Sequence, residues 1–365
     1  MTHDRASIFD FHPATLEQRF EAIGLPKFAS QQVLEWVYAK GVTDFEQMTN
    51  LSKLARAKLA ETFTVLQGEV IRHQVATDGT QKLLVGWRTA QERAAQRTGD
   101  IRLAGGEPSK QTETVMIPTE DRKTACVSSQ VGCPVGCAFC ASGIGGLDGN
   151  LTSGQIVEQV WRLARLEGVD RISNVVFMGM GEPLANFSSV MDAIRTLNAP
   201  WGMGIGARKI TVSTVGLPAA IRKLCTFEIP ITLALSLHAP NDELRRQIIP
   251  WAEYSTIKEL LEACEEWFRK TGREITLEYI MLGGFNDRRE HAVELAALAN
   301  SLRANVNLIR YNEVKGIPFS RPEDGIVQRF QELLRDLGVN VHIRASRGRD
   351  IAAACGQLRH ESIAS

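Results

Sequence analysis

Apolar residues between Thr15 and Phe63 recur at intervals of three and four, the spacing that places side chains on one face of an α-helix. Val33, Leu34, Val37 and Tyr38 show this period, with polar residues between the apolar ones. The pattern predicts a small N-terminal helical domain.

The same stretch carries aromatic and basic side chains that have two interpretations. They are Lys27, Phe28, Trp36, Tyr38 and Lys40. One interpretation places them on a surface that binds RNA. The other places Trp36 in the core, which is the commoner position for a tryptophan on an amphipathic helix and the one we favour.

After the helical stretch the period changes to two. Residues from Glu69 to Trp87 alternate in the manner of β-strands, and Asp78-Gly79 supplies a turn of the kind that joins two strands of a hairpin. Between Arg88 and Lys110 the apolar period fades and Arg, Gln, Gly and Pro dominate. This composition predicts an exposed linker or mobile loop.

Beyond residue 120 short β-rich runs alternate with helical stretches. Six such runs are found, at Thr124–Ser128, Asn174–Met178, Lys209–Thr214, Ile231–Leu237, Ile275–Met281 and Val306–Tyr311. Strands separated by helices predict successive βα units and a parallel sheet. Right-handed crossovers would wind these units into an incomplete barrel with functional groups at the C-terminal strand ends. We therefore predict an α/β fold, a partial (β/α)6 TIM-like barrel with a small N-terminal helical domain.

Two helices of this region have a recognisable start. Thr152 with Gln155, and Thr256 with Glu259, fit the capping box, in which two side chains satisfy N–H groups of the first turn. These pairs predict helices that begin after Thr152 and after Thr256.

The changes of pattern divide the chain into four parts. We expect a helical accessory domain at residues 1–68 and a β-rich connector at 69–118, with the exposed loop near 88–110. The barrel is expected at 119–346, and a C-terminal segment at 347–365.

Composition excludes several classes of protein. Hydrophobic residues make up 44% and charged residues 23% of the chain, which argues against a disordered or fibrous protein. Apolar runs are too short to span a membrane, and residues 1–10 lack the apolar part of a secretory signal, so we expect a cytoplasmic protein with reduced thiols. The 42 basic residues balance 42 acidic ones, so any nucleic-acid surface must be local.

Three of the seven cysteines, Cys133, Cys137 and Cys140, are clustered at a Cx3Cx2C spacing. An odd total and this clustering fit a disulfide framework poorly. Three thiolates on one loop can converge on a metal centre. Zinc usually takes a fourth protein ligand, whereas a 4Fe-4S cluster held by three cysteines leaves one iron open. The spacing alone leaves structural or zinc-binding cysteines as the alternative.

The Cx3Cx2C motif follows the first strand of the βα repeat. In both its spacing and this position it resembles the motif of the radical S-adenosylmethionine (SAM) superfamily. The resemblance implies that the three cysteines hold a 4Fe-4S cluster whose open iron binds SAM. The segment from Gly179 to Pro183 resembles the superfamily's Gly-Glu-Pro segment, which meets the methionine amino group. Taken alone, that segment has the alternative interpretation of a simple turn at a strand end.

Further segments narrow the resemblance to the RlmN/Cfr family of radical SAM RNA adenine methyltransferases, and within it to RlmN. They extend from about Leu25 to the C-terminus and include Lys27-Phe28, Trp36, Met48 to Ser52, Cys126 to Cys133, Ser213-Thr214, Ser236 to Asp242, Gly283-Gly284 and Arg347 to Leu358. The segment from Arg88 to Lys110 departs from the family in its length. The resemblance implies methylation of carbon 2 of a specific adenine in 23S ribosomal RNA and of the adenine beside the anticodon in tRNAs.

The resemblance also assigns chemistry to residues outside the cluster. Carbon 2 of adenine is electron-poor and has no lone pair to attack a methyl group, so a simple transfer should fail. In the family's chemistry Cys355 takes a methyl from one SAM, and a second SAM provides the radical that activates this methyl. Cys126 then closes a transient disulfide with Cys355, and Glu113 accepts the ring proton. From the sequence alone Glu113 has another interpretation, a solvated carboxylate at a strand edge.

Other positions match the residues with which the family binds SAM. They are Gly181, Glu182, Ser213, Ser236, Leu237, His238 and Asn312. Each lies at or just after a predicted strand end, as a barrel requires. A lone serine or asparagine there is more often a cap or turn residue, so the expectation rests on the set.

The RNA surface is expected to be assembled from a few basic residues, with solvated or salt-bridged charges as the alternative for each one. The candidates are Lys27, Lys40, Arg245, Arg246, Arg344, Arg347 and Arg349. The other expected partner is an electron donor such as flavodoxin, and we expect a monomer.

Two alternative functions stay open. One is methylation at carbon 8 of adenine, the Cfr activity, which uses the same cysteine roles. The other is a non-catalytic iron-sulfur or zinc protein that binds RNA, which would leave Cys126 and Cys355 without a role.

Overall fold

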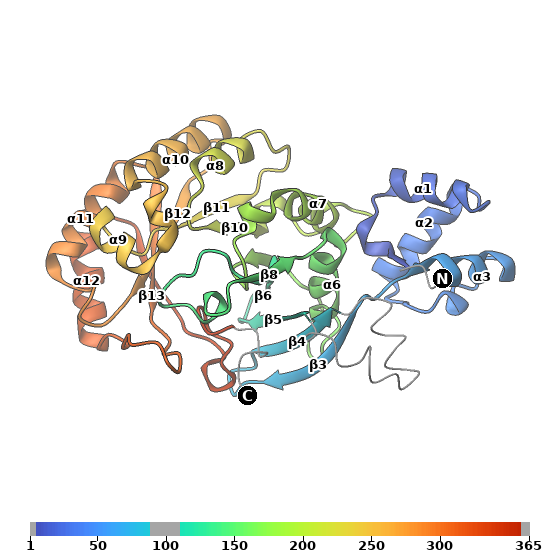
Figure 1. Cartoon of the computed structure of the whole chain (residues 1–365), viewed down its shortest axis with the longest axis horizontal. Helices are drawn as coiled ribbons and strands as arrows, with labels where there is room; N and C mark the ends of the chain where they lie inside the picture. The colour runs from blue at the N-terminus through green and yellow to red at the C-terminus, as the bar shows by residue number, and fades with distance from the viewer. Residues whose placement is uncertain (1–4, 88–109, 359–365) are drawn as a thin grey trace.

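The computed structural model describes residues 5–87 and 110–358 (Figure 1). Its main element is a ten-stranded sheet with the order β14-β13-β12-β11-β10-β9-β6-β5-β4-β3. The strands from β6 to β14 are parallel, namely β6 (Lys123–Cys126), β9 (Asn174–Phe177), β10 (Ile210–Thr214), β11 (Thr232–Ser236), β12 (Ile275–Met281), β13 (Ala304–Arg310) and β14 (Val341–Arg344). The six predicted strands are confirmed, and β14 is a further parallel strand that the sequence pattern did not predict.

Helices follow these strands and cover the outer face of the curved sheet (Figure 1). They are α6 (Ser153–Leu163), α7 (Phe187–Asn198), α8 (Pro218–Leu224), α10 (Ile257–Thr271), α11 (Arg289–Asn300) and α12 (Asp324–Asp336). The short helix α9 (Asp242–Ile248) lies apart from them, and its Ile248 packs with Val135 and Phe139. Both predicted capping boxes form, at the starts of α6 and α10. The main hydrophobic core lies between the strands and these helices, with Val175, Val212 and Leu233 fully buried. The sheet is open at β14, so the barrel is partial, as predicted.

Three antiparallel strands extend the other edge of the sheet. They are β3 (Gly68–Val75), β4 (Gln81–Trp87) and β5 (Lys110–Pro118), and β5 pairs with β6. The predicted hairpin turn is present between β3 and β4, and Gly79 has φ = 79°, a conformation that favours glycine. Most of the predicted exposed loop, residues 88–109, lies outside the described residues.

The N-terminal part is helical, as predicted, and lies beyond α6 and α7 (Figure 1). It contains β1 (Ala6–Ser7), η1 (Ile8–Asp10), α1 (Pro13–Ala22), α2 (Phe28–Leu34), the π-helical turn η2 (Glu35–Ala39), η3 (Phe45–Gln47), α3 (Lys53–Thr62) and β2 (Phe63–Thr64). It is tied to α6 because Trp161 donates a hydrogen bond to the carbonyl of Val37 and Gly154 donates one to Asp10. Trp36 is only partly buried: it packs against the core, and its indole N–H donates to Asn50.

Short elements complete the chain. β7 (Gln130–Gly132) and β8 (Leu147–Asn150) form a hairpin whose connection carries the clustered cysteines. The remaining turns are η4 (Ala141–Gly143), η5 (Pro183–Asn186), η6 (Ala207–Lys209), η7 (Pro250–Glu253) and η8 (Arg349–Ile351). Within residues 5–87 and 110–358, none of the helices has the length and apolar character needed to cross a membrane.

Candidate active site

A cavity of about 140 Å³ lies at the C-terminal ends of the parallel strands. Strands β9 to β14 each contribute to its wall, with Phe177, Ser213, Ser236, Glu278, Ile309 and Arg344 among the lining residues. In an α/β barrel this end is where the loops meet and where functional groups gather. We call it the cofactor cavity.

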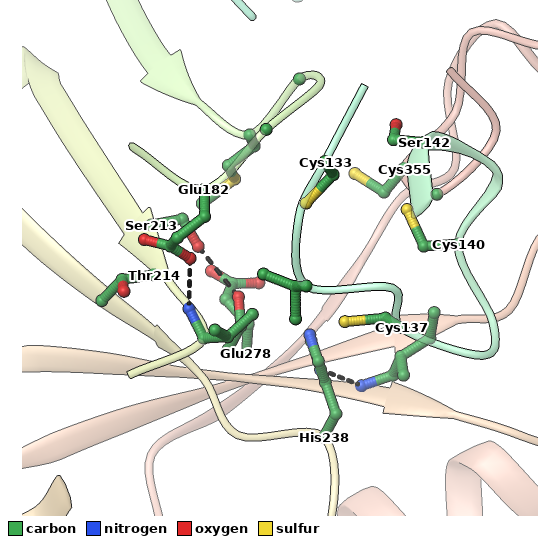
Figure 2. A pocket seen from close by; sticks show the side chains of 18 of the residues that line it. Cys133, Cys137, Cys140, Ser142, Glu182, Ser213, Thr214, His238, Glu278 and Cys355 are labelled. Carbon is green, nitrogen blue, oxygen red and sulfur yellow. Dashed lines mark hydrogen bonds between the residues drawn. The ribbon is translucent and has the colours of Figure 1, made fainter. Parts of the chain in front are cut away.

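The three clustered cysteines line one side of the cofactor cavity (Figure 2). Their loop is shaped at its base by Gly132, which has φ = 74° and whose added Cβ would lie 2.0 Å from the carbonyl oxygen of Gly146. Cys133 donates its N–H to the same carbonyl at 2.8 Å, and Cys140 donates to the carbonyl of Cys137 at 3.0 Å. The loop is therefore closed by backbone hydrogen bonds, which leaves the thiols to face the cavity.

The chemistry of these thiols fits an iron-sulfur cluster. Burial raises the pKa of all three, that of Cys133 to about 12. Thiolates are the metal-binding form of cysteine, and bound iron compensates their charge in a buried site. In the described part of the chain no group of three His, Cys, Asp or Glu side chains is arranged to hold a single metal ion. A four-iron cluster needs a wider arrangement, because each cysteine binds a different iron.

Opposite the cysteines, the side chain of Glu182 is fixed by backbone donors. Its two carboxylate oxygens accept hydrogen bonds from the N–H groups of Leu184 and Val215 at 3.0 and 2.9 Å. Its own N–H donates to Gln130 at 2.8 Å. Burial raises the pKa of Glu182 although these hydrogen bonds oppose the shift. The preceding Gly181 has φ = 100°, and a side chain there would collide with Gln130.

The predicted residues of β10 and β11 lie next to one another in the same cavity. The hydroxyl oxygens of Ser213 and Ser236 are 3.1 Å apart. His238 accepts a hydrogen bond at Nδ1 from the N–H of Ile280 at 3.1 Å, and burial lowers its pKa to about 3, so it is neutral. Leu237 is fully buried and does not line the cavity; its backbone N–H donates to the carbonyl of Glu278.

Cys355 lines the cofactor cavity on the side of the cysteine loop (Figure 2). Asn312 does not line this cavity, but its amide lies 3.4 Å from the carbonyl oxygen of Cys355. Cys126 is also absent from the wall, because it is buried in a cluster with Val115, Met180 and Leu358. The structure thus brings Asn312 and Cys126 to the segment that carries Cys355 rather than to the cavity itself.

Glu113 lies in a second cavity of about 400 Å³, which we call the outer cavity. It is 3% exposed, so the interpretation as a solvated strand-edge carboxylate is wrong. Its Oε1 lies 2.7 Å from Nζ of Lys82. The C-terminal segment contributes to both cavities: Cys355 and Gly356 line the cofactor cavity, and residues 349–352 and 357 line the outer one.

Two residues of these cavities, Glu278 and Lys82, were not predicted from the sequence. Glu278 lies in the cofactor cavity with Oε1 accepting a hydrogen bond from Asn307 and Oε2 3.7 Å from Nη1 of Arg344. Its signal was visible as a single acidic residue inside the apolar run of β12. Lys82, which pairs with Glu113, gave no such signal, because lysines are common in exposed hairpins.

Two of the basic residues that we expected to bind RNA, Arg245 and Arg344, lie inside the barrel mouth instead. Arg245 is 1% exposed and donates to the backbone carbonyls of Leu237 and Val215, so its assignment to the RNA surface is wrong. Arg344 faces the cofactor cavity, where its guanidinium donates to the sulfur of Met178. At the barrel mouth Arg245 thus satisfies backbone carbonyls, and Arg344 lies beside a thioether and the carboxylate of Glu278.

The other basic candidates remain near the surface. Arg246 and Arg349 are exposed, and Arg347 is half-buried. Lys27 and Lys40 pair with Glu21 and Glu35, and Lys40 also stacks over the ring of Trp36 at 3.9 Å.

Comparison with known proteins gives two family matches. Residues 6–65 match the ribosomal RNA large subunit methyltransferase N-terminal domain, and residues 127–296 match the radical SAM superfamily.

Individual relatives are similar over almost the whole chain. The probable dual-specificity RNA methyltransferase RlmN of Rhodopirellula baltica is 43% identical over 338 residues, which cover 92% of this chain and 86% of the relative. The dual-specificity RNA methyltransferase RlmN of Marinomonas sp. is 40% identical, with 97% and 93% covered. The crystal structure of a radical SAM methyltransferase from Sphaerobacter thermophilus superposes with a TM-score of 0.89 at 41% identity, covering 97% of this chain and 99% of that one.

Proposed function

Because this chain belongs to the RlmN family of radical SAM RNA methyltransferases, we propose that it methylates carbon 2 of a specific adenine in 23S ribosomal RNA and of the adenine beside the anticodon in tRNAs. The family and the fold make it a SAM-dependent RNA methyltransferase with a 4Fe-4S cluster. What we propose beyond this is the carbon atom that is methylated, the identity of the two RNA substrates and the role of each residue.

One observation carries this function: the segment that holds Cys355 forms part of the wall of both cavities. On one side the thiol of Cys355 shares the cofactor cavity with Cys133, Cys137 and Cys140. On the other side lies the cavity that contains Glu113. A methyl group carried by Cys355 can therefore be loaded and activated on one side and meet an RNA base that enters from the other.

The cluster, held by Cys133, Cys137 and Cys140, and SAM supply the one-electron chemistry that removes a hydrogen atom from an S-methyl group. The chain positions the SAM molecule. Gly181 allows close approach of the backbone, and the Glu182 carboxylate, held by two N–H donors, accepts from the methionine amino group. The hydroxyls of Ser213 and Ser236, the ring of neutral His238 and the backbone of Leu237 complete the site, with Asn312 holding the adjacent segment.

Three side chains take part in the methyl transfer: Cys355, Glu113 and Cys126. The sulfur of Cys355 accepts it from one SAM and loses its thiol proton, and a second SAM is used for activation, so each turnover consumes two. After the activated carbon has bonded to carbon 2, Glu113 accepts the ring proton of that carbon. The thiolate of Cys126 then attacks the sulfur of Cys355. A disulfide forms and the bond between that sulfur and the carbon breaks. The freed carbon takes a proton and becomes the methyl group of the released base, and the one electron left over from the radical addition would return to the cluster.

The reaction also needs an RNA surface and an external electron donor. We assign residues 1–68 to a helical accessory domain, 69–118 to the β-rich connector, 119–346 to the barrel and 347–365 to the carrier segment, which holds Cys355. A specific adenine has to leave its stack to reach a thiol inside a cavity. Arg347 and Arg349, beside the outer cavity, contact the backbone of this RNA. An electron donor such as flavodoxin reduces the cluster, and the enzyme acts as a monomer.

The decisive experiment is anaerobic reconstitution followed by reaction with RNA and SAM. We expect iron and sulfide in the protein, release of 5′-deoxyadenosine, and 2-methyladenosine in nucleosides from 23S ribosomal RNA. A product of 8-methyladenosine would instead support the carbon-8 activity. Bound zinc without cleavage of SAM would contradict the enzyme and support a non-catalytic protein. A deletion strain that retains full tRNA methylation would limit the substrate to ribosomal RNA.

A further inference from the structure

The carrier segment is attached to the β3–β4 hairpin by two hydrogen bonds that run in opposite directions. The N–H of Gly348 donates to Oδ2 of Asp78 at 3.0 Å, and the N–H of Thr77 donates to Oδ2 of Asp350 at 2.9 Å. The hairpin turn and the segment are separated by most of the barrel in sequence, so these contacts form only in the folded chain.

Lys82, on β4 of the same hairpin, makes a third connection. Its Nζ lies 2.7 Å from Oε1 of Glu113 and donates to the carbonyl oxygen of Ala352 at 3.2 Å. The side chains of Lys82 and Glu113 are 6% and 5% exposed. A buried carboxylate is unfavourable without a compensating charge, and the ammonium group supplies that charge here. Since an ammonium has three N–H donors, one Lys82 side chain can hold both groups at once.

The backbone at this contact adopts an uncommon conformation. Ala352 has φ = 50°, in the left-handed region that non-glycine residues rarely occupy. Gly348 has φ = 63°, and an added Cβ would lie 2.8 Å from the side chain of Thr80. Such conformations persist only where surrounding contacts maintain them, and they concentrate at functional sites. The carbonyl that Lys82 holds belongs to the strained Ala352, three positions before Cys355.

We propose that Lys82 is a positioning residue that fixes the segment carrying Cys355 relative to the carboxylate of Glu113. The inference rests on the proposed roles of these two residues. In the proposed reaction the carrier must reach carbon 2 while the base reaches the proton on the same carbon. The two groups lie on different segments, so their separation has to be maintained, and small displacements of reacting groups reduce rates strongly. Lys82 contacts both segments directly.

The test compares Lys82→Met with Glu113→Gln in the full-length, cluster-loaded enzyme. Two quantities are measured: hydrogen exchange of the amides at 348–356, and the single-turnover rate of RNA methylation. Lys82→Met should raise the exchange about tenfold or more and lower the rate about 10- to 100-fold. Glu113→Gln should lower the rate but leave the exchange unchanged, because Lys82 still donates to Ala352.

Two further variants separate positioning from a general structural role. Lys82→Arg should restore both quantities in large part, because a guanidinium can donate to the carboxylate and the carbonyl together. Lys110→Met, at the exposed start of β5, removes a lysine from the same sheet and should change neither quantity. If Lys82→Met fails to fold, the double variant Lys82→Met/Glu113→Gln leaves no unpaired buried charge. Its exchange should still exceed that of Glu113→Gln.

Unchanged exchange at 348–356 in Lys82→Met would overturn the proposal, whatever the rate. Raised exchange with an unchanged rate would overturn it too, because the position of the segment would then not matter. Failure of the proposed function has a different signature: Glu113→Gln would methylate RNA at the wild-type rate. In that case Glu113 is not the base, and the exchange data still decide whether Lys82 holds the segment.

Discussion

Cys126 and Cys355 lie within electrostatic reach of each other, although one belongs to β6 and the other to the C-terminal segment. The pKa of Cys126 is raised to about 12, mainly by burial; the neighbouring Cys355 thiol acts in the same direction and the guanidinium of Arg344 in the opposite one. Cys126 is therefore protonated in the resting enzyme. In the proposed mechanism, this arrangement keeps the Cys126 thiol unreactive beside the proposed methyl carrier until the last step.

Replacing the two cysteines separately should block different steps. Cys355→Ala removes the methyl acceptor, so neither methylated RNA nor a protein–RNA adduct should form. Cys126→Ala leaves methyl loading and addition to the base intact but removes the thiol that breaks the link. It should therefore accumulate protein bound covalently to RNA through Cys355, detected by denaturing gel and by mass spectrometry of the cross-linked peptide.

The cluster is the control for both variants, because Cys133, Cys137 and Cys140 are unchanged. Iron content should equal that of the wild type, and Cys225→Ala, at the C-terminal end of α8 and outside both cavities, should turn over normally. Loss of iron in both variants would make Cys126 and Cys355 cluster ligands or folding residues. Normal turnover of Cys126→Ala would assign the last step to another thiol.

Arg344 should control the reactivity of Cys126. With a pKa near 12, the thiolate fraction of Cys126 rises about tenfold per pH unit across pH 7–10, and alkylation by iodoacetamide should rise with the same slope. Arg344→Gln removes the positive charge, so alkylation should be slower at each pH and the RNA adduct should persist longer. Arg344→Lys keeps the positive charge, so its alkylation rate should lie between those of Arg344→Gln and the wild type. A plateau of the alkylation rate near pH 9 would show an ordinary thiol and contradict this account.

The parts of the fold that follow local rules were predictable, and β14 shows where such rules end. The capping boxes at Thr152 and Thr256 and the apolar runs of β9 to β13 are complete within a few residues, so their pattern identifies them. β14 has four residues and an exposed His342, and it is a strand because it pairs with β13. Because β14 is defined by its pairing with β13, its own four residues are too few to predict a strand from their pattern.

The site divides in the same way. The cysteine cluster and the Gly-Glu-Pro segment are local motifs, and the structure places both in one cavity. Arg245 and Arg246 are neighbours with the same side chain, yet one is buried against backbone carbonyls and the other is exposed. Only the packing of α9 against the barrel separates them. Lys82 and Glu113 likewise become partners through the register of β4 and β5, which the sequence does not display.

Glu182 should matter more for SAM binding than for folding. Glu182→Gln leaves an amide NH₂ facing one of the backbone N–H donors that now bind the carboxylate, which costs one hydrogen bond. Burial raises the pKa of Glu182, which means that its charged form is unfavourable in this site. The loss of that charge therefore offsets part of the cost of the lost hydrogen bond. In the proposed SAM site, however, the lost charge also removes a charge-assisted hydrogen bond with the amino group of SAM, worth about 1.5–3 kcal/mol. SAM affinity measured by calorimetry on the cluster-loaded protein should therefore fall about 10- to 150-fold.

The comparison for Glu182→Gln is Glu253→Gln, an exposed glutamate of η7 whose replacement should leave SAM affinity unchanged. The thermal unfolding midpoint of both variants should stay close to that of the wild type. Equal SAM affinity in Glu182→Gln and the wild type would remove this carboxylate from the cofactor site.

The proposed RNA surface beside the outer cavity can be tested through the salt dependence of RNA binding. Arg349 is exposed and lines that cavity, and Arg347 lies two positions before it, whereas the chain as a whole has no net charge. Each phosphate contact releases counterions and contributes about 0.7–0.9 to the slope of log affinity against log salt. Arg347→Gln/Arg349→Gln should therefore weaken binding of a tRNA anticodon stem-loop and flatten the slope by about 1.5. Arg269→Gln, exposed on α10, serves as the control and should keep the wild-type slope. If the double variant also keeps the wild-type slope, Arg347 and Arg349 do not contact the RNA backbone. Other residues must then neutralise the phosphate charge.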